Sequence, residues 1–210
     1  MKTFDPNDYQ YNGLEPVTVV DDYLWTFKLD LDTSKFYDQC LDVNNTIIEM
    51  FGSPEEEHQY GSDSAYYHNK YNFLTSFSPN NHRLFGLLQQ CSMKIVRNDH
   101  YYIRCWLNKY DESKNIEWHR HWDADDKSYH GFYCVNVEGD NLSSAQYRIP
   151  NHGEVEIISR NNILVIGKSE DDYHRSTPWL NNGSRITIAF DIVPVTKCHA
   201  KKLNDVIPLI

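Results

Sequence analysis

Short apolar segments separated by turn residues fill the second half of this 210-residue chain, and they limit the folds open to it. Strand-like runs occur at Tyr101–Tyr110, Ile116–Asp123, His130–Val137, Ala145–Ile149, Val155–Ile158, Ile163–Ile166 and Ile186–Val193. Turn-forming pairs such as Gly139-Asp140 and Asn182-Gly183 lie between them. Many short strands at regular spacing are typical of an all-β sandwich or barrel.

The first hundred residues differ, because they combine short strands with two helical patterns. The alternation of apolar residues predicts strands at Val17–Val20 and Leu24–Leu31. Helices are expected from about Thr33 to Met50 and over Leu84–Ile95. We therefore predict one domain over residues 1–210, with supporting strands and helices in 1–100, a β core in 101–194 and a C-terminal tail in 195–210.

A polar, tyrosine-rich segment separates the two expected helices. Residues 59–77 contain five tyrosine and phenylalanine residues besides Phe77 itself. Long segments of this kind are often functional when they are ordered. Two readings stay open: a lid or substrate loop, and a surface loop whose aromatic rings cover the core.

Charge and cysteine content exclude several classes of protein. With 30 acidic and 20 basic residues the net charge is −10, which argues against a protein that coats nucleic acid. No stretch approaches the roughly 18 apolar residues of a membrane span, and the first ten residues lack the apolar core of a signal peptide. The five scattered cysteines form no Cys-x-x-Cys pair. We expect free thiols and a cytoplasmic protein without nucleic-acid or membrane partners.

The densest group of metal-binding side chains lies in Glu117–Asp123. Side chains alternate between the two faces of a strand, so His119, His121 and Asp123 are expected to share one face. His121, Asp123 and a second histidine would form a two-histidine, one-carboxylate set that suits iron(II). His119 and His121 are also a same-face pair, which leaves open a site in which they are the ligands and Asp123 is not.

The second histidine and an anion-binding pair follow further along the chain. His174 comes shortly after the apolar run Ile163–Ile166, and Arg185 and Thr187 share one face of the next expected strand. A guanidinium group can bind a carboxylate through two hydrogen bonds, and a nearby hydroxyl adds another. The pair therefore predicts a receptor for the far carboxylate of a dicarboxylate cosubstrate.

Together these motifs resemble the iron(II)- and 2-oxoglutarate-dependent dioxygenase superfamily, and within it the prolyl-hydroxylase-like branch. The motifs that carry the resemblance are, in chain order, Tyr110, His121-x-Asp123, the strand Phe132–Asn136, His174 and Arg185-x-Thr187. The segment Ser143–Pro150 stands where the family has Gly-Gly-x-x-x-Phe-Pro, and it lacks those glycines. The resemblance covers about Tyr101 to Pro194.

The resemblance implies a distorted double-stranded β-helix, the cupin-like jelly roll of that superfamily. It also implies hydroxylation of a small-molecule or peptidyl substrate with iron(II), 2-oxoglutarate and O2, giving succinate and CO2. Carried over by position, the metal ligands are His121, Asp123 and His174. The residues implied to bind the cosubstrate are Arg185, Thr187, Tyr110 and Tyr133.

Residues next to these motifs are candidates for the substrate pocket, namely Trp118, His119, Arg175 and Trp179. Two other functions stay open at this point. One is a non-catalytic, cupin-like metal-binding domain, which has no need of Arg185 and Thr187. The other is a zinc hydrolase that uses His119, His121 and His174 and requires a general base nearby.

Overall fold

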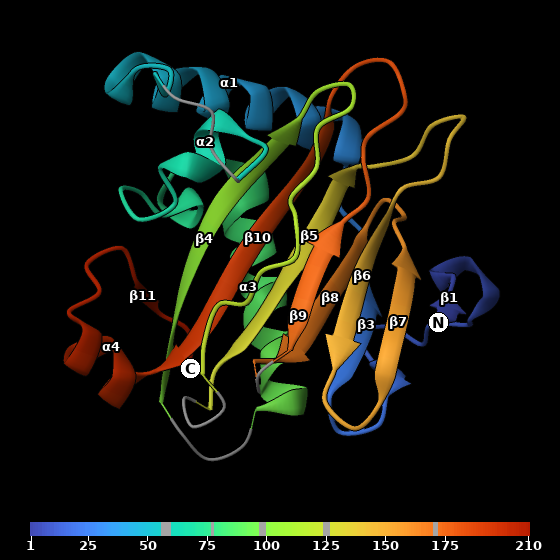
Figure 1. The fold of residues 1–210 in the computed structure, drawn as a ribbon. Helices are drawn as coiled ribbons and strands as arrows, with labels where there is room; N and C mark the ends of the chain where they lie inside the picture. The colour runs from blue at the N-terminus through green and yellow to red at the C-terminus, as the bar shows by residue number, and fades with distance from the viewer. Residues whose placement is uncertain (56–59, 77, 97–99, 124–126, 170–171) are drawn as a thin grey trace.

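The computed structural model describes residues 1–55, 60–76, 78–96, 100–123, 127–169 and 172–210 (Figure 1). Its strands are β1 (Lys2–Phe4), β2 (Val17–Val20), β3 (Leu24–Lys28), β4 (Tyr101–Tyr110), β5 (Tyr129–Asn136), β6 (Ser144–Ile149), β7 (Gly153–Ile158), β8 (Ile163–Lys168), β9 (Tyr173–Ser176), β10 (Arg185–Pro194) and β11 (Ile207–Pro208). Its helices are α1 (Thr33–Phe51), α2 (Asp63–Tyr66), α3 (Pro79–Ile95) and α4 (Val195–Lys201), with 3-10 turns η1 (Pro6–Asp8) and η2 (Phe73–Thr75).

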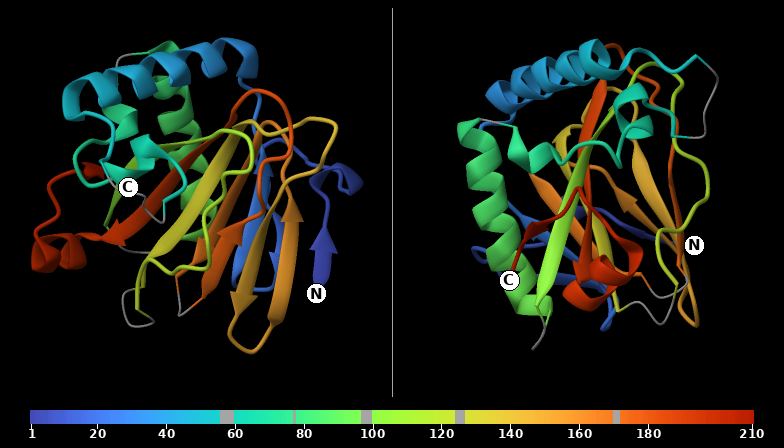
Figure 2. Two further views of the ribbon diagram at one scale, coloured as in Figure 1. Left: turned by 45° about the horizontal axis from the view of Figure 1, so that its top comes forward. Right: turned by 90° about the vertical axis from the view of Figure 1, so that its left-hand side faces the viewer.

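These elements form two sheets that face each other (Figures 1 and 2). The larger sheet has the strand order β11-β4-β10-β5-β8-β3-β2 and is antiparallel throughout. The smaller sheet has the order β1-β7-β6-β9, with a parallel pair only between β1 and β7. Both ends of the chain therefore add strands to the β core, beyond the expected range 101–194.

Two apolar cores stabilise this arrangement, one on each face of the larger sheet. Helices α1 and α3 cover its outer face (Figure 2), and their buried residues Phe36, Leu84 and Leu88 pack in one cluster with strand residues such as Ile188. Between the sheets, Tyr147 of the smaller sheet belongs to a second cluster of buried residues. Apolar faces buried on both sides of the larger sheet account for the continuous apolar runs in β8 and β10.

The two long helices, α1 and α3, begin at clear capping residues. The Asp32 side chain accepts a hydrogen bond from Lys35 N at the start of α1, and Ser78 accepts one from Asn81 N at the start of α3. Pro79 occupies the first turn of α3, where its missing N–H costs nothing. This Ser-Pro start explains why α3 begins five residues before the expected Leu84. No helix of the described residues is long and apolar enough to cross a membrane.

The tyrosine-rich segment lies along the edge of β4 rather than projecting from the surface, although Gln59 and Phe77 fall outside the described residues. Ser62 Oγ accepts a hydrogen bond from Lys109 N at 3.0 Å, and Ser64 Oγ donates one to Leu107 O at 3.0 Å. Tyr71 OH accepts from Leu107 N at 2.8 Å. Strand β11 pairs only with residues 102 and 103 of β4. The three bonds above satisfy main-chain N–H and C=O groups further along the same edge of β4.

Candidate functional site

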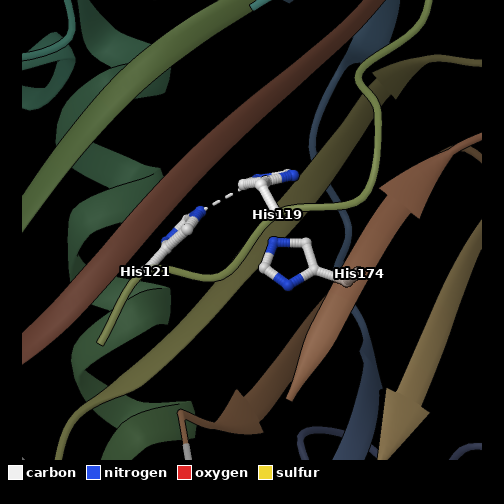
Figure 3. Close-up of side chains that lie close together, drawn as sticks. All are labelled: His119, His121 and His174. Atoms are coloured by element: carbon white, nitrogen blue, oxygen red, sulfur yellow. Dashed lines mark hydrogen bonds between the residues drawn. The ribbon is translucent and has the colours of Figure 1, made fainter. Parts of the chain in front are cut away.

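Three histidine rings meet at the edge of the smaller sheet (Figure 3). An isolated bridge pairs His119 with His174, in which each backbone N–H donates to the other's carbonyl at 3.0 and 2.9 Å. His121 lies two residues beyond this bridge. One ring nitrogen of each histidine lies within 4.8 Å of those of the other two. Figure 3 shows the three rings around a common space, so they form a candidate metal site.

Each of these rings has an oxygen atom beside its Nδ1. His119 Nδ1 lies 2.8 Å from Glu117 O, and His121 Nδ1 lies 2.6 Å from Asp191 Oδ1. His174 Nδ1 is 3.4 Å from Asp172 Oδ2, the longest and least well aligned of the three contacts. Metal-binding histidines commonly donate one ring N–H to a carboxylate or carbonyl, which leaves the other nitrogen for the metal. Here that other nitrogen is Nε2.

Burial keeps two of the rings neutral. Desolvation and the nearby His121 lower the pKa of His119 to about 4. Desolvation, with His130 and His119 close by, lowers the pKa of His174 well below its usual value. A neutral imidazole is the form that binds a metal ion, so both rings are ready ligands near pH 7.

Two buried carboxylates lie behind the rings, and each is paired with a cation. Burial would raise the pKa of Asp191, but His121 and Arg104 hold it well below its usual range. Burial would likewise raise the pKa of Asp172, but His130 and His174 lower it. The Asp172 carboxylate in turn outweighs the desolvation of His130, whose pKa is raised. Both carboxylates are therefore ionised inside the protein.

The three histidines open onto a cavity of about 250 Å³ that also contains the predicted anion-binding residues. Arg185, Thr187 and Tyr110 line it together with His119, His121 and His174. Arg185 and Tyr110 are adjacent partners in the β4–β10 register, and the Arg185 guanidinium carbon lies 5.7 Å from the centroid of the Tyr110 ring. The structure thus brings both halves of the predicted site into one cavity.

Arg185 is a buried cation with only weak neutral partners. It is 2 % exposed, its two terminal nitrogens reach Thr177 O at 3.4 Å and Ser159 Oγ at 3.3 Å, and its Nε has no hydrogen-bond partner. Among the described residues no carboxylate lies within ion-pair distance of it. Burial lowers the pKa of Arg185, and burial raises the pKa of Tyr110 to about 12. A guanidinium group in this position has room and need for an anionic ligand.

Asp123 does not join the three histidines. Its side chain is 71 % exposed, and its Oδ1 lies 3.4 Å from Arg120 Nη2. The predicted strand Ile116–Asp123 is not a regular strand, because its pairing with β9 is reduced to the single bridge at His119. Trp122 then turns into a buried cluster with Val193 and Cys198, so the alternation of faces ends before Asp123. The geometry supports the alternative pair, His119 with His121.

Tyr133 lies on the wrong face of β5 for a cosubstrate residue. It is fully buried in the core beneath the helices, where its hydroxyl donates to Asn162 Oδ1 at 2.6 Å. Phe132, its neighbour on the opposite face, is among the residues that line the cavity. Because side chains alternate along the strand, Cys134, the residue after Tyr133, lies on the same face as Phe132.

The four predicted pocket residues divide evenly. His119 and Arg175 line the cavity, while Trp118 and Trp179 do not. Trp118 stacks between two guanidinium groups, with the carbon of Arg148 at 4.0 Å and that of Arg175 at 4.7 Å from the ring centroid. Trp179 is 1 % exposed, and its Nε1 donates to Gly183 O at 3.0 Å, which fixes the loop before β10.

Sequence reasoning missed the two carboxylates behind the rings, although both left a signal. Asp191 is the only acidic residue in the apolar strand Arg185–Pro194, an unusual position for a charge. Asp172 precedes His174 by two residues, the same spacing that links His119 to His121. His130, which pairs with Asp172, begins the predicted strand His130–Val137, and no local pattern indicates this pairing.

Comparison with known proteins identifies the fold. No family model and no curated protein matches the sequence. The structure is similar to a Trichoplax adhaerens prolyl hydroxylase in complex with a hypoxia-inducible factor peptide, with a TM-score of 0.64, 11 % identity and coverage of 86 % of this chain and 87 % of that one. A Pseudomonas putida prolyl-4-hydroxylase gives a TM-score of 0.56, 10 % identity and coverage of 81 % and 91 %.

The chain shares its jelly-roll fold with these two hydroxylases. The expected distorted double-stranded β-helix is confirmed by these similarities, which extend over most of both chains. A non-heme α-ketoglutarate-dependent epimerase, SnoN, from nogalamycin biosynthesis is also similar, with a TM-score of 0.56, 7 % identity and coverage of 82 % and 78 %. One jelly roll therefore supports different reactions, which the groups at each site determine.

Proposed function

We propose that this protein is an iron(II)- and 2-oxoglutarate-dependent dioxygenase that hydroxylates a small-molecule or peptidyl substrate and releases succinate and CO2. His119, His121 and His174 hold the metal through Nε2. Arg185 binds the C5 carboxylate of 2-oxoglutarate, and the hydroxyl groups of Tyr110 and Thr187 add hydrogen bonds. The bound iron supplies the activation of O2; the protein supplies ligand geometry, orientation of the cosubstrate and exclusion of water.

The buried, unpaired guanidinium of Arg185 carries the proposal. A cation that is 2 % exposed and lacks an acidic partner among the described residues is costly to keep in an apo-protein. It lines the same cavity as the three imidazoles. A ligand that joins a metal-binding head to a distant carboxylate satisfies both ends of this cavity, and 2-oxoglutarate is such a ligand.

The remaining cavity wall supports a substrate with a small reacting group. Ala65 and Ala189 are small residues of the lining, and Trp106 and Phe132 provide an apolar wall. A second buried set of metal-binding groups consists of His130, Asp172 and His174. His130 and Asp172 are each 2 % exposed and lie 3.0 Å apart, so a metal ion bound there would have to replace this contact.

The test is an anaerobic titration of the protein with iron(II) and 2-oxoglutarate, followed through the weak visible charge-transfer band of the ternary complex. The band is expected for the wild type and is lost in His174→Ala and Arg185→Ala. Arg148→Ala, which removes an exposed arginine outside the cavity, is the matched control and keeps the band. Absence of the band in the wild type contradicts the proposal.

Substrate class requires a separate screen. Succinate formation is measured with prolyl peptides, free amino acids and nucleobases, and stimulation above the uncoupled rate identifies the class. A peptide is the first choice, because a prolyl hydroxylase bound to a peptide is among the similar structures.

A zinc hydrolase is the second candidate, because three imidazoles are a known catalytic zinc set. Such an enzyme needs a general base beside the metal. The cavity wall contributes no carboxylate side chain among the described residues, and Asp172 and Asp191 are already paired. Oxygen-independent ester hydrolysis by the zinc-loaded protein, retained in Arg185→Ala, would favour this candidate instead.

A further inference from the structure

We propose that Asp191 and Asp172 are positioning residues that hold His121 and His174 in their metal-binding orientation from outside the coordination sphere. The inference deepens the proposed function, since it rests on the three-histidine site. Neither buried acid contacts the anion-binding residues, so the proposed function alone gives them no role. Arg104 is the partner that fixes Asp191, and His130 is the partner that fixes Asp172.

Asp191 divides its two oxygens between two partners. Its Oδ2 receives Arg104 Nε at 2.9 Å and Nη2 at 2.7 Å, while its Oδ1 lies 2.6 Å from His121 Nδ1. Asp191 and Arg104 are register partners on β10 and β4, so the main chain of the larger sheet fixes this pair. With Nδ1 donating to a rigid carboxylate, His121 is restricted to the tautomer that offers Nε2 to a metal.

Asp172 lies beside His174, with His130 in place of the arginine, and its contacts are longer or less well aligned than the hydrogen bonds of Asp191. Asp172 Oδ2 lies 3.0 Å from His130 Nε2 and 3.4 Å from His174 Nδ1. His130 is on β5 of the larger sheet and His174 on β9 of the smaller one, and their rings are stacked with centroids 4.3 Å apart. Asp172 thus links a ligand on the smaller sheet to a buried side chain, His130, on the larger one.

His119 differs from the other two rings because no side-chain carboxylate lies beside its Nδ1. Its Nδ1 contact is a backbone carbonyl, Glu117 O, which no side-chain substitution removes. A carboxylate partner raises the basicity of an imidazole ligand more than a neutral carbonyl does, because it stabilises the positive charge that the ring gains on binding a cation. The acids therefore act on His121 and His174 only.

The experiment measures cobalt(II) binding by the purified apo-protein without 2-oxoglutarate, from both the affinity and the visible d–d spectrum at saturation. Asp191→Asn and Asp172→Asn keep the side-chain size and remove the charge. Each is expected to bind cobalt(II) about 10- to 100-fold more weakly and to show altered band positions or intensities. The change in spectrum is a readout that a loss of overall stability does not produce at saturating metal.

Asp205→Asn is the matched control. Asp205 also faces Arg104, with Oδ2 3.9 Å from Nη1, and no contact joins it to a histidine of the site. This variant is expected to bind cobalt(II) like the wild type. Because Asp191→Asn removes the nearer of the two carboxylates that face Arg104, Arg104→Met/Asp191→Asn removes that cation as well and is expected to bind cobalt(II) as weakly as the single variant.

The outcomes separate the two proposals. Folded Asp191→Asn and Asp172→Asn proteins that bind cobalt(II) with wild-type affinity and spectrum overturn the positioning role. A wild type that binds cobalt(II), with both variants weakened, supports the role even if 2-oxoglutarate then fails to bind, a result that overturns only the proposed function. A wild type that binds no cobalt(II) overturns both.

Discussion

His119 Nε2 and His121 Nε2 face each other at 3.2 Å across the candidate metal site. If both rings donate from Nδ1, as their oxygen partners at Glu117 and Asp191 indicate, both Nε2 atoms carry lone pairs. Two lone pairs at this distance repel unless a cation or a proton lies between them. The pair is therefore arranged to share one positive charge, either a metal ion or a proton.

The ligand set can be tested by comparing His119→Ala with Asp123→Ala. His119→Ala removes one of three ligands and is expected to weaken cobalt(II) or iron(II) binding at least 100-fold. Asp123→Ala changes an exposed side chain and is expected to keep wild-type affinity. Metal affinity is measured by competition with a chromophoric chelator. The opposite ranking of the two variants would restore the two-histidine, one-carboxylate set.

A second prediction concerns the cost of keeping Arg185 buried. Arg185→Met removes an unpaired charge at similar length, so the free energy of unfolding of the apo-protein is expected to stay equal or to rise by about 1–2 kcal/mol. Urea unfolding measures this change. In the same experiment, 2-oxoglutarate with cobalt(II) raises the stability of the wild type beyond cobalt(II) alone, and it has no such effect on Arg185→Met. A strongly destabilised apo variant would indicate a structural role for the arginine.

The regular parts of this fold were predictable because their signals are local. The apolar runs of β4 and β10 and the pattern of α1 place these elements to within a few residues. Strands β1, β9 and β11 have two to four residues and gain their pairing from distant partners, so local patterns do not show them. The same limitation affected the segment before Asp123, where a tertiary contact of Trp122 overrides the strand pattern.

In the candidate site, the sequence predicted the placement of the anion-binding residues more completely than that of the metal ligands. Arg185 and Thr187 lie on a long strand that pairs with β4 along its whole length, so the alternation of faces applies to both. His119, His121 and Asp123 sit where pairing is lost, and Tyr133 could not be separated from Cys134 by spacing alone. Asp172 and Asp191 act through contacts between the two sheets or between neighbouring strands, which no local pattern contains.

The stability of the apo-protein is expected to fall as the pH decreases from about 7 to 5. The pKa of His119 is about 4 in the folded state, and burial lowers that of His174 as well, whereas unfolded histidines titrate near 6.5. Between these values the unfolded state binds more protons, so the free energy of unfolding falls by up to about 1.4 kcal/mol per pH unit for each group. The pKa of His130 is raised in the folded state, so this ring gains protons on folding. It opposes the trend only above the pKa of an unfolded histidine, near 6.5.

The measurement is urea unfolding at pH 7, 6 and 5 in the presence of a chelator. Asp172 and Asp191, whose pKa values are lowered, lose their contribution only below the unfolded value near 3.9 and do not act in this range. His119→Gln removes one titrating group and is expected to show a clearly smaller dependence on pH. Equal slopes for the two proteins would mean that His119 is not held neutral.

A final prediction concerns the attachment of the tyrosine-rich segment. Asn72 is 6 % exposed; its Nδ2 donates to Ile103 O at 3.0 Å and to Asp205 O at 2.8 Å, and its Oδ1 accepts from Leu74 N. Asn72→Ala leaves three main-chain groups without partners and is expected to lower the free energy of unfolding by about 2–4 kcal/mol. Thermal and urea unfolding measure the loss, and Asn69→Ala, at an exposed position of the same segment, is the control. Asn72 joins this segment to β4 and to the C-terminal residues, so amide exchange in Ser62–Tyr71 is expected to accelerate in the variant. Unchanged exchange there would show that the bonds from the serine and tyrosine side chains to β4 hold the segment without Asn72.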